Sequence, residues 1–230
     1  MRAVSRKLLA TGMLLCCLAT PVLADFNAGE SAYRRGDYNT AMKELRPLAE
    51  KGHTSAELYL GLMYERGDGV SQDFSEAARW YRKAAEHGDR DAQFNLGTMH
   101  DEGKGVPQNH AEAARWYRAA AANGDNQAQF NLATMYFQGL GVQKDLAEAM
   151  KWFRMSAEQG DAKAQYNVGS MYFNGIGVQK DYVVAHMWVT LAAQQGHEVA
   201  AKELKFISSK MTPAQIGEAQ KRARGWKPKK

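Results

Sequence analysis

One histidine of this 230-residue chain is followed directly by two carboxylates, a combination that could hold a metal ion or move a proton. The three residues are His100, Asp101 and Glu102. Adjacent residues of a helix point in different directions, so their side chains would not converge on one atom. Tyr64 and Tyr136 stand 36 residues before and after His100, which indicates that its ring fills a packing position. We therefore favour a core histidine over a metal ligand or a general base.

Other signatures of enzyme chemistry are absent from the sequence. It contains no Gly-x-Ser-x-Gly elbow, no Ser-x-x-Lys pair and no phosphate-binding loop. The other histidines are scattered, and none forms a zinc-type pair with a glutamate. Four Gly-x-Gly-Val segments have no strand before them, so we interpret them as turns and not as nucleotide sites. The sequence therefore predicts that the protein is not an enzyme, and it offers no residue for a catalytic, cofactor-binding or metal-binding role.

A 36-residue repeat supplies the helices on which His100 and the Gly-x-Gly-Val segments are placed. In each copy, alanine, leucine or valine, and methionine recur in the first half, and alanine and tryptophan recur in the second half. Apolar residues at i, i+3, i+4 and i+7 predict two amphipathic helices in each copy. Because strand-like alternation is absent, we predict an all-α fold. The four copies run without a gap over residues 53–88, 89–124, 125–160 and 161–196.

The sequence also provides start and stop signals for these helices. A small residue, Gly61 in the first copy, should let the partner helix approach closely. We attribute both glycines of the Gly-x-Gly segment to the C-cap of the first helix, where a positive φ is required. An Asp or Asn followed three residues later by Glu predicts a capping box before the second helix in three copies. These pairs are Asp73 with Glu76, Asn109 with Glu112, and Asp145 with Glu148, whereas Asp181 is followed by Val184.

Tryptophans of the second helices recur at core spacing with alanines around them. We interpret them as packing residues and not as a platform for stacking carbohydrate. They are Trp80, Trp116, Trp152 and Trp188, and Trp226 falls outside this pattern.

The ordered run of these motifs resembles the Sel1-like repeat, a relative of the tetratricopeptide repeat with two more residues in its inter-helix loop. The motifs Ala-x-x-x-Leu-Gly-x-x-Tyr, Gly-x-Gly-Val-x-x-Asp and Ala-x-x-Trp-Tyr-x-x-Ala-Ala-x-x-Gly carry the resemblance across four full copies. Residues 25–52 are similar to a shorter, tetratricopeptide-like helix pair. The resemblance implies a right-handed α/α superhelical solenoid that serves as an adaptor for other proteins. A few members of the family have been described as weak hydrolases.

The first 24 residues have the composition of a cleavable signal peptide. Arg2, Arg6 and Lys7 precede an apolar segment from Leu8 to Ala19. The residues Pro21-Val22-Leu23-Ala24 then stand directly before Asp25. We expect cleavage after Ala24 and a periplasmic or secreted mature protein. The apolar segment is shorter than the roughly 20 residues that a membrane-spanning helix needs. Both cysteines of the chain lie within it, so the mature protein would contain no disulfide.

The C-terminal segment, residues 197–230, has the pattern of capping helices followed by a basic tail. Thr212, Pro213 and Gln215 form the start signal of a last helix whose apolar face would cover the end of the stack. Residues 25–196 carry 18 basic and 22 acidic residues, whereas residues 197–230 carry 9 and 3. The tail could make weak contact with an anionic membrane or an acidic protein, although a solvated tail is the simpler interpretation. Export and the slightly acidic array argue against nucleic acid as a partner.

Polar residues on the outer face of the first helices are the candidate binding residues. In a solenoid of helix pairs, the first helix of each pair lines the concave side. Residues three and four apart share a helix face, and the 36-residue period stacks them into ladders along a groove. Asparagine both donates and accepts hydrogen bonds, so these ladders suit an extended peptide backbone. The candidates are Arg66, Asn95, Thr98, Glu102, Asn131, Thr134, Gln138, Asn167, Ser170 and Asn174.

Two interpretations of the recurring asparagines stay open at this point. Their identity in three copies favours hydrogen bonds to the backbone of a neighbouring repeat over contact with a ligand. The positions that vary between copies are then better candidates for partner specificity, and these are Arg66, Glu102, Gln138 and Asn174.

These features predict an exported scaffold or adaptor that binds a peptide or protein segment in its concave groove, within a bacterial envelope process. The alternative is a cell-wall or β-lactam binding module, or a weak hydrolase of the envelope. Altered partner choice after changes in the groove would favour the first function. Turnover of glycans or β-lactams, or thermal stabilisation by them, would favour the second.

Overall fold

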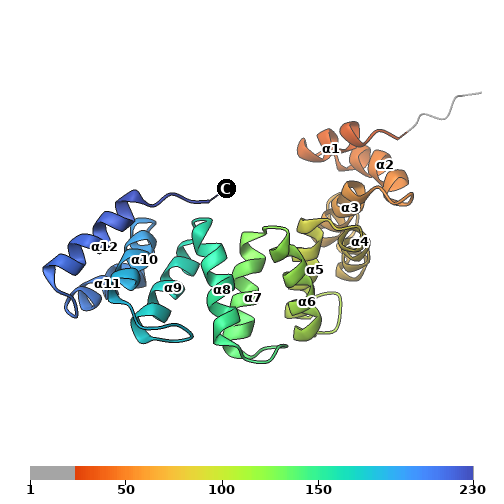
Figure 1. The fold of residues 1–230 in the computed structure, drawn as a ribbon. Helices are drawn as coiled ribbons and strands as arrows, with labels where there is room; N and C mark the ends of the chain where they lie inside the picture. The colour runs from red at the N-terminus through yellow and green to blue at the C-terminus, as the bar shows by residue number, and fades with distance from the viewer. Residues whose placement is uncertain (1–23, 230) are drawn as a thin grey trace, which may run out of the picture.

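The computed structural model describes residues 24–229, and every regular element in that range is an α-helix. The predicted signal peptide therefore lies outside the described residues, apart from Ala24. Twelve described helices follow one another along an open arc from α1 and α2 to α11 and α12 (Figure 1). Their bounds are α1 Phe26–Arg34, α2 Tyr38–Ala49, α3 Thr54–Arg66, α4 Phe74–Glu86, α5 Arg90–Glu102, α6 His110–Ala122, α7 Asn126–Gln138, α8 Leu146–Glu158, α9 Ala162–Asn174, α10 Tyr182–Gln194, α11 Glu198–Ser208 and α12 Pro213–Gly225.

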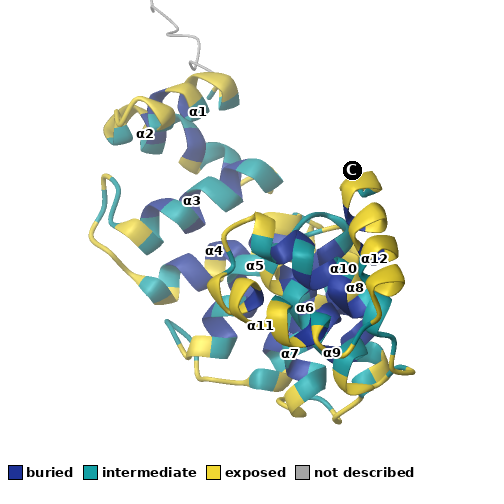
Figure 2. Ribbon diagram, turned by 90° about the vertical axis from the view of Figure 1, so that its left-hand side faces the viewer, coloured by how far each residue is buried: buried dark blue, intermediate teal, exposed yellow. Residues whose placement is uncertain are grey.

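Each helix packs mainly on the helices before and after it in the chain, from α1 to α11. This order confirms the prediction of an all-α solenoid. Buried residues lie where the helices face one another, and exposed residues cover the outer surfaces (Figure 2). None of the helices within residues 24–229 has the length and apolar character needed to cross a membrane.

The core residues are those that the repeat pattern predicts. Ala56, Leu60 and their counterparts in the next three copies are fully buried. The four repeated tryptophans are only 5–8% exposed, which confirms their packing role. Burial of such large rings along every helix pair supplies most of the apolar area that stabilises an array of this kind.

Small residues in the first helices allow the two helices of a repeat to touch. A Cβ atom on Gly97 of α5 would lie 2.8 Å from Cδ1 of Tyr117 in α6, so the tyrosine ring or the helix would have to shift. Gly61 meets Tyr81 and Gly169 meets Val189 in the same way. The predicted close approach is therefore confirmed.

The two glycines of each inter-helix loop have different functions, which corrects the prediction that a C-cap explains both. Gly139 ends α7 with a φ of 80°, and its N–H donates to the carbonyl of Met135. Gly141, with a φ of 68°, lies against α6 of the preceding repeat, where a Cβ atom would overlap the backbone of His110. The second glycine is therefore a packing position between repeats, and its counterparts Gly69, Gly105 and Gly177 lie against Tyr38, Phe74 and Leu146.

The second helices begin at the predicted Asp and Asn residues, but the predicted capping boxes do not close. Asp73 accepts hydrogen bonds from the N–H groups of Ser75 and Glu76 at 2.9 and 3.0 Å. Its own N–H already donates to the carbonyl of Tyr64, so Glu76 finds no donor there and pairs with Arg79 instead. The other two glutamates behave alike, Glu112 pairing with Arg115 and Glu148 with Lys151.

A buried glutamine joins each repeat to the one before it. In α7, the amide of Gln129 donates to the carbonyl of Ala121, near the end of α6, at 3.2 Å. Gln159, just after α8, donates to Oε1 of Gln129 at 2.9 Å. The side-chain amide of Gln129, which is 1% exposed, therefore hydrogen-bonds to the end of α6 through Ala121 and to the end of α8 through Gln159.

This glutamine ladder runs through the whole array. Gln93 and Gln165 occupy the same place in α5 and α9 and make the same two hydrogen bonds. In the first copy the position holds the buried Glu57, whose carboxylate lies 2.9 Å from Nδ1 of His87. These glutamines form a polar ladder on the packed side of the first helices, which differs from the ladders predicted for the groove.

The last helix begins at the predicted start signal and packs on the array through one face. Thr212 and Gln215 form a reciprocal capping box at the start of α12, with Pro213 in its first turn. Ala219 and Ala223 of α12 are buried, and the helix packs mainly on α10.

The basic tail is exposed at residues 227–229, as the interpretation of a solvated tail implies, but it contacts the array at Lys229. The N–H of Lys229 donates to the carbonyl of Glu158 at 2.8 Å, and its Nζ lies 2.7 Å from the Glu158 carboxylate. The ring of Trp226 packs edge-on against Trp188, with ring centroids 6.1 Å apart. The chain end therefore returns from α12 toward α8, as Figure 1 shows. Lys230 lies outside the described residues.

Replacing Gly141 by alanine should destabilise the protein more than replacing Gly124. Both glycines have a positive φ, where alanine costs about 1–2 kcal/mol. Only Gly141 faces backbone of the preceding repeat, because nothing lies within 4 Å of a Cβ atom at Gly124. We expect an additional loss of about 1–3 kcal/mol in the free energy of unfolding for Gly141→Ala, measured by urea titration. Equal losses at both sites would contradict the packing role of Gly141.

Replacing Gln129 by leucine should cost about 1–3 kcal/mol of unfolding free energy, because the buried carbonyl of Ala121 loses its donor and the amide of Gln159 loses one of its two acceptors. Asn167→Ala is the matched control. Asn167 stands two residues after the ladder glutamine of the next repeat and is half-buried in the groove, so its loss should change the unfolding free energy by no more than about 0.5 kcal/mol. Thermal unfolding followed by circular dichroism measures both changes. A neutral Gln129→Leu variant would show that the ladder does not hold the repeats.

Candidate functional site

The ten predicted groove residues lie on the first helices α3, α5, α7 and α9, and none of them is fully buried. Arg66, Glu102, Gln138 and Asn174 end these helices and are exposed. The remaining six are half-buried. The predicted ladders therefore lie on an accessible surface.

The recurring asparagines do not hold the stack together through the backbone. Within residues 24–229, no hydrogen bond joins Asn95, Asn131 or Asn167 to the backbone of another repeat. The favoured interpretation of the asparagines is thus wrong, because the buried glutamines perform this role.

The hydroxyl groups of the ladder bond mostly within their own helices. Thr98 and Thr134 donate to the carbonyls of Phe94 and Phe130, four residues earlier. Thr98 also accepts from the hydroxyl of Tyr117 at 3.2 Å. These bonds satisfy the threonine hydroxyls within their own helices.

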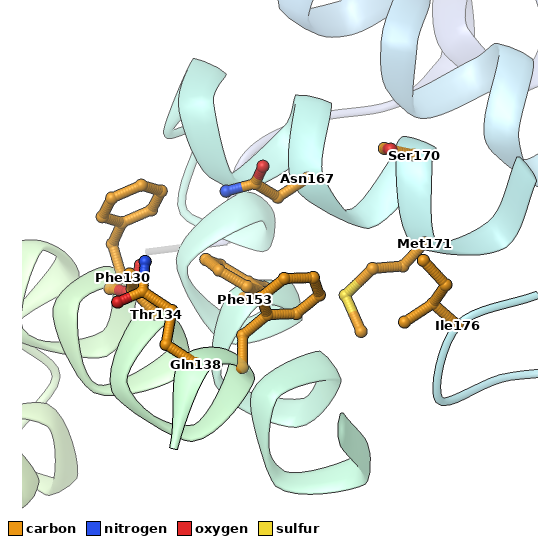
Figure 3. Close-up of a pocket in the computed structure, with 9 residues that line it drawn as sticks. Phe130, Thr134, Gln138, Phe153, Asn167, Ser170, Met171 and Ile176 are labelled. Atoms are coloured by element: carbon orange, nitrogen blue, oxygen red, sulfur yellow. The ribbon is translucent and has the colours of Figure 1, made fainter. Parts of the chain in front are cut away.

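Four of the predicted residues meet around one cavity of about 320 Å³ between α7, α8 and α9 (Figure 3). Thr134 and Gln138 contribute from α7, and Asn167 and Ser170 contribute from α9. The rest of the lining is apolar and consists of Phe130, Phe137, Phe153, Met171 and Ile176. A mainly apolar hollow with a few polar groups at its edge is the usual form of a site for a small ligand or a single large side chain.

A second cavity of about 390 Å³ continues the groove between α9 and α11. Ser170 lines both cavities, and Asn174 lines the second. Phe173 and Phe206 supply aromatic surface, with ring centroids 5.7 Å apart. The sequence pattern did not identify these aromatic residues, although Phe137 and Phe173 stand where the first two copies have Glu65 and Asp101.

The N-terminal end of the groove is held by hydrogen bonds between tyrosines and charged groups. The hydroxyl of Tyr33 accepts from Arg66 at 3.1 Å and donates to Asp68 at 3.2 Å. Tyr59 donates to Glu30 at 2.8 Å. Arg66 therefore already has a hydrogen-bond partner, and it lies on α3, which lines neither cavity.

His100 is a core residue, as predicted. It is 7% exposed, and its Nε2 lies 3.3 Å from the Arg82 guanidinium. Burial and the charge of Arg82 both lower the pKa of His100. Asp101 turns away to pair with His110 at 2.8 Å, so the triplet does not converge.

No other cluster suggests metal or acid–base chemistry in the described part of the chain. It contains no group of three His, Cys, Asp or Glu side chains placed to bind a metal ion. The buried His186 lies 3.1 Å from the hydroxyl of Ser208, but that hydroxyl donates to the carbonyl of Leu204. Its proton is thus directed away from the imidazole, and burial lowers the pKa of His186.

Solved structures with the same architecture come from bacteria. A Sel1 repeat protein from Oxalobacter formigenes is 31% identical, with a TM-score of 0.78 and a match that covers 86% of this chain and 85% of that one. A protective antigen of uropathogenic Escherichia coli strains that displays an SLR fold is 34% identical, with a TM-score of 0.73, over 86% of this chain and 44% of that one.

The repeats themselves match a family model and part of a curated relative. The exopolysaccharide production negative regulator of Rhizobium leguminosarum bv. viciae is 46% identical over 48 residues, which span 21% of this chain and only 18% of that relative. The model described as Sel1 repeat matches residues 54–89, 90–125, 126–161 and 162–197, more than half of the chain. With its fourfold match and this solenoid architecture, the chain belongs to the Sel1 repeat family.

Proposed function

We propose that this protein is an exported scaffold that binds a peptide or protein segment in the groove of its first helices. Sel1 repeat proteins commonly mediate protein–protein interactions, and the groove offers a place for one here. The observation that carries the proposal is the apolar cavity between α7 and α9 with Thr134, Gln138, Asn167 and Ser170 at its edge.

The geometry of the groove suits an extended segment better than a compact ligand. Two cavities lie side by side along it and share Ser170, so neighbouring side chains of one segment could occupy both. Amide side chains at the edges, such as Asn167 and Asn174, can donate to and accept from a peptide backbone. Large side chains buried in such pockets usually contribute most of the binding energy of an interface.

Two observations support a role in the bacterial envelope. Asp25, which follows the predicted cleavage point, is the N-cap of α1 and accepts from the N–H of Asn27 at 2.9 Å. The first described helix thus begins next to the predicted cleavage point. One relative of the repeat segment is named as a negative regulator of exopolysaccharide production.

Replacing Ser170 by arginine should block both cavities and abolish partner binding. We expect crosslinking capture from the native host to lose the groove partner at least about tenfold, which corresponds to about 1.4 kcal/mol. Met155→Arg, at a 37% exposed position of α8, adds the same side chain outside the groove and should retain the partner. Unchanged capture by a Ser170→Arg variant of normal helicity would contradict the proposed groove.

The mature protein should begin at Asp25 and accumulate outside the cytoplasm. Intact-mass measurement of protein purified from the native host checks the first residue, and cell fractionation checks the location. Ala24→Asp should prevent cleavage, because signal peptidases require a small residue at that position. A full-length cytoplasmic product of the natural sequence would refute export.

A further inference from the structure

The two halves of the groove differ systematically at two positions of the repeat. The residue before the last of each first helix is Glu65, Asp101, Phe137 and Phe173 in the four copies. Seven residues later, in the loop, the copies carry Gln72, Gln108, Lys144 and Lys180. Both positions change between the second and the third copy, from an acid with a glutamine to a phenylalanine with a lysine.

In the first two copies the glutamine closes the loop onto its own helix. Gln72 donates to the carbonyl of Glu65 at 2.8 Å, and Gln108 donates to that of Asp101 at 2.7 Å. The carboxylates also have partners, since Glu65 accepts from the hydroxyl of Tyr81 at 2.6 Å. This half of the groove is thus acidic and internally bonded, and no large apolar side chain stands at these two positions.

In the last two copies the phenylalanine at the first position lines a cavity, and the lysine at the second position lies near aromatic rings outside the cavity lining. Phe137 lines the first cavity and Phe173 lines the second. Lys144 holds its Nζ 5.9 Å from the centroid of the Phe137 ring. The Nζ of Lys180 lies 5.9 Å from the centroid of the Tyr182 ring, and the centroid of that ring lies 5.4 Å from the centroid of the Phe173 ring. A cation therefore stands beside the aromatic wall of each cavity.

Helix α11 extends this pattern beyond the last repeat. Phe206, 55% exposed, lines the second cavity together with Lys202. Lys210 holds its Nζ 5.2 Å from the Phe206 ring, and Lys210 stands one repeat after Asn174. Within residues 24–229 only Lys151 and Lys229 pair with carboxylates, so none of these four lysines forms an ion pair. One carboxylate, that of Glu203, also lines the second cavity, where it accepts a hydrogen bond from the hydroxyl of Tyr166 at 3.1 Å.

We infer that the C-terminal half of the groove, formed by α7, α9 and α11, takes an acidic peptide segment with bulky apolar side chains. The apolar side chains fill the two cavities, and neighbouring carboxylates face Lys144, Lys180, Lys202 and Lys210. A lysine-rich segment would meet like charges and is selected against. This inference rests on the proposed function and names the chemistry of the partner.

Selection from a random peptide display library, followed by fluorescence anisotropy, tests the inference. We expect the selected peptides to be rich in Phe, Leu, Asp and Glu. A fluorescein-labelled selected peptide should bind at least about tenfold more tightly than the same peptide with lysine in place of its acids, and less so at high salt. Lys144→Gln with Lys180→Gln should remove this preference while weaker binding persists.

The chain itself offers matched controls for the test. Phe137→Asp with Lys144→Gln gives the third copy the pair that the second copy carries, so the variant should fold and lose the peptide. Asp101→Phe with Gln108→Lys makes the opposite change outside the cavities and should leave binding unchanged. Circular dichroism verifies the fold of each variant.

The possible results separate the two proposals. Peptides that are selected without acidic residues, lose affinity with Phe137→Asp and ignore the lysine changes would overturn the inference and keep the proposed function. A library from which no peptide is enriched would overturn both.

Discussion

A buried amide in each first helix fixes how the helix pairs of this protein stack, and the surface used for binding follows from that constraint. Gln129 satisfies a carbonyl at the end of α6 and accepts from Gln159 after α8. At the other end of α6, Gly141 of the next loop packs against its first turn. Each repeat is thus held at both ends of the preceding second helix. Successive first helices are brought into register, and their outer faces form one groove.

Much of this architecture could be predicted from the sequence because the repeat itself identifies the core. Tryptophans, alanines and the small residue of the first helix recur at helical spacing, and the structure buries them. The glutamine ladder was missed because hydrophobic periodicity assigns a polar residue to the solvated face of a helix. The cavities were missed because they lie between repeats, where Phe137 and Phe153 meet Met171. A pattern read within one repeat does not describe such a contact.

The end of the array shows how one substitution stops a repeating structure. Lys205 of α11 stands 36 residues after Gly169, at the place where every full repeat has a small residue under a side chain of its second helix. A lysine there prevents the same close approach, and α12 packs mainly on α10 instead. The tail then crosses to Glu158 and covers the end of α8. Because α12 is not placed over α11, Phe206 stays exposed at the end of the groove.

Stability and recognition are carried by different faces of the same helices. Substitutions on the packed face remove buried hydrogen bonds or apolar contacts, and they cost several times more free energy than substitutions on an exposed face. The ladder position accordingly holds the same glutamine in three copies, whereas the last residue of the first helix is Arg66, Glu102, Gln138 or Asn174. The groove can therefore change its charge from one repeat to the next while the stack keeps its geometry. An array built in this way can acquire an acidic half and a lysine-lined half without any change of fold.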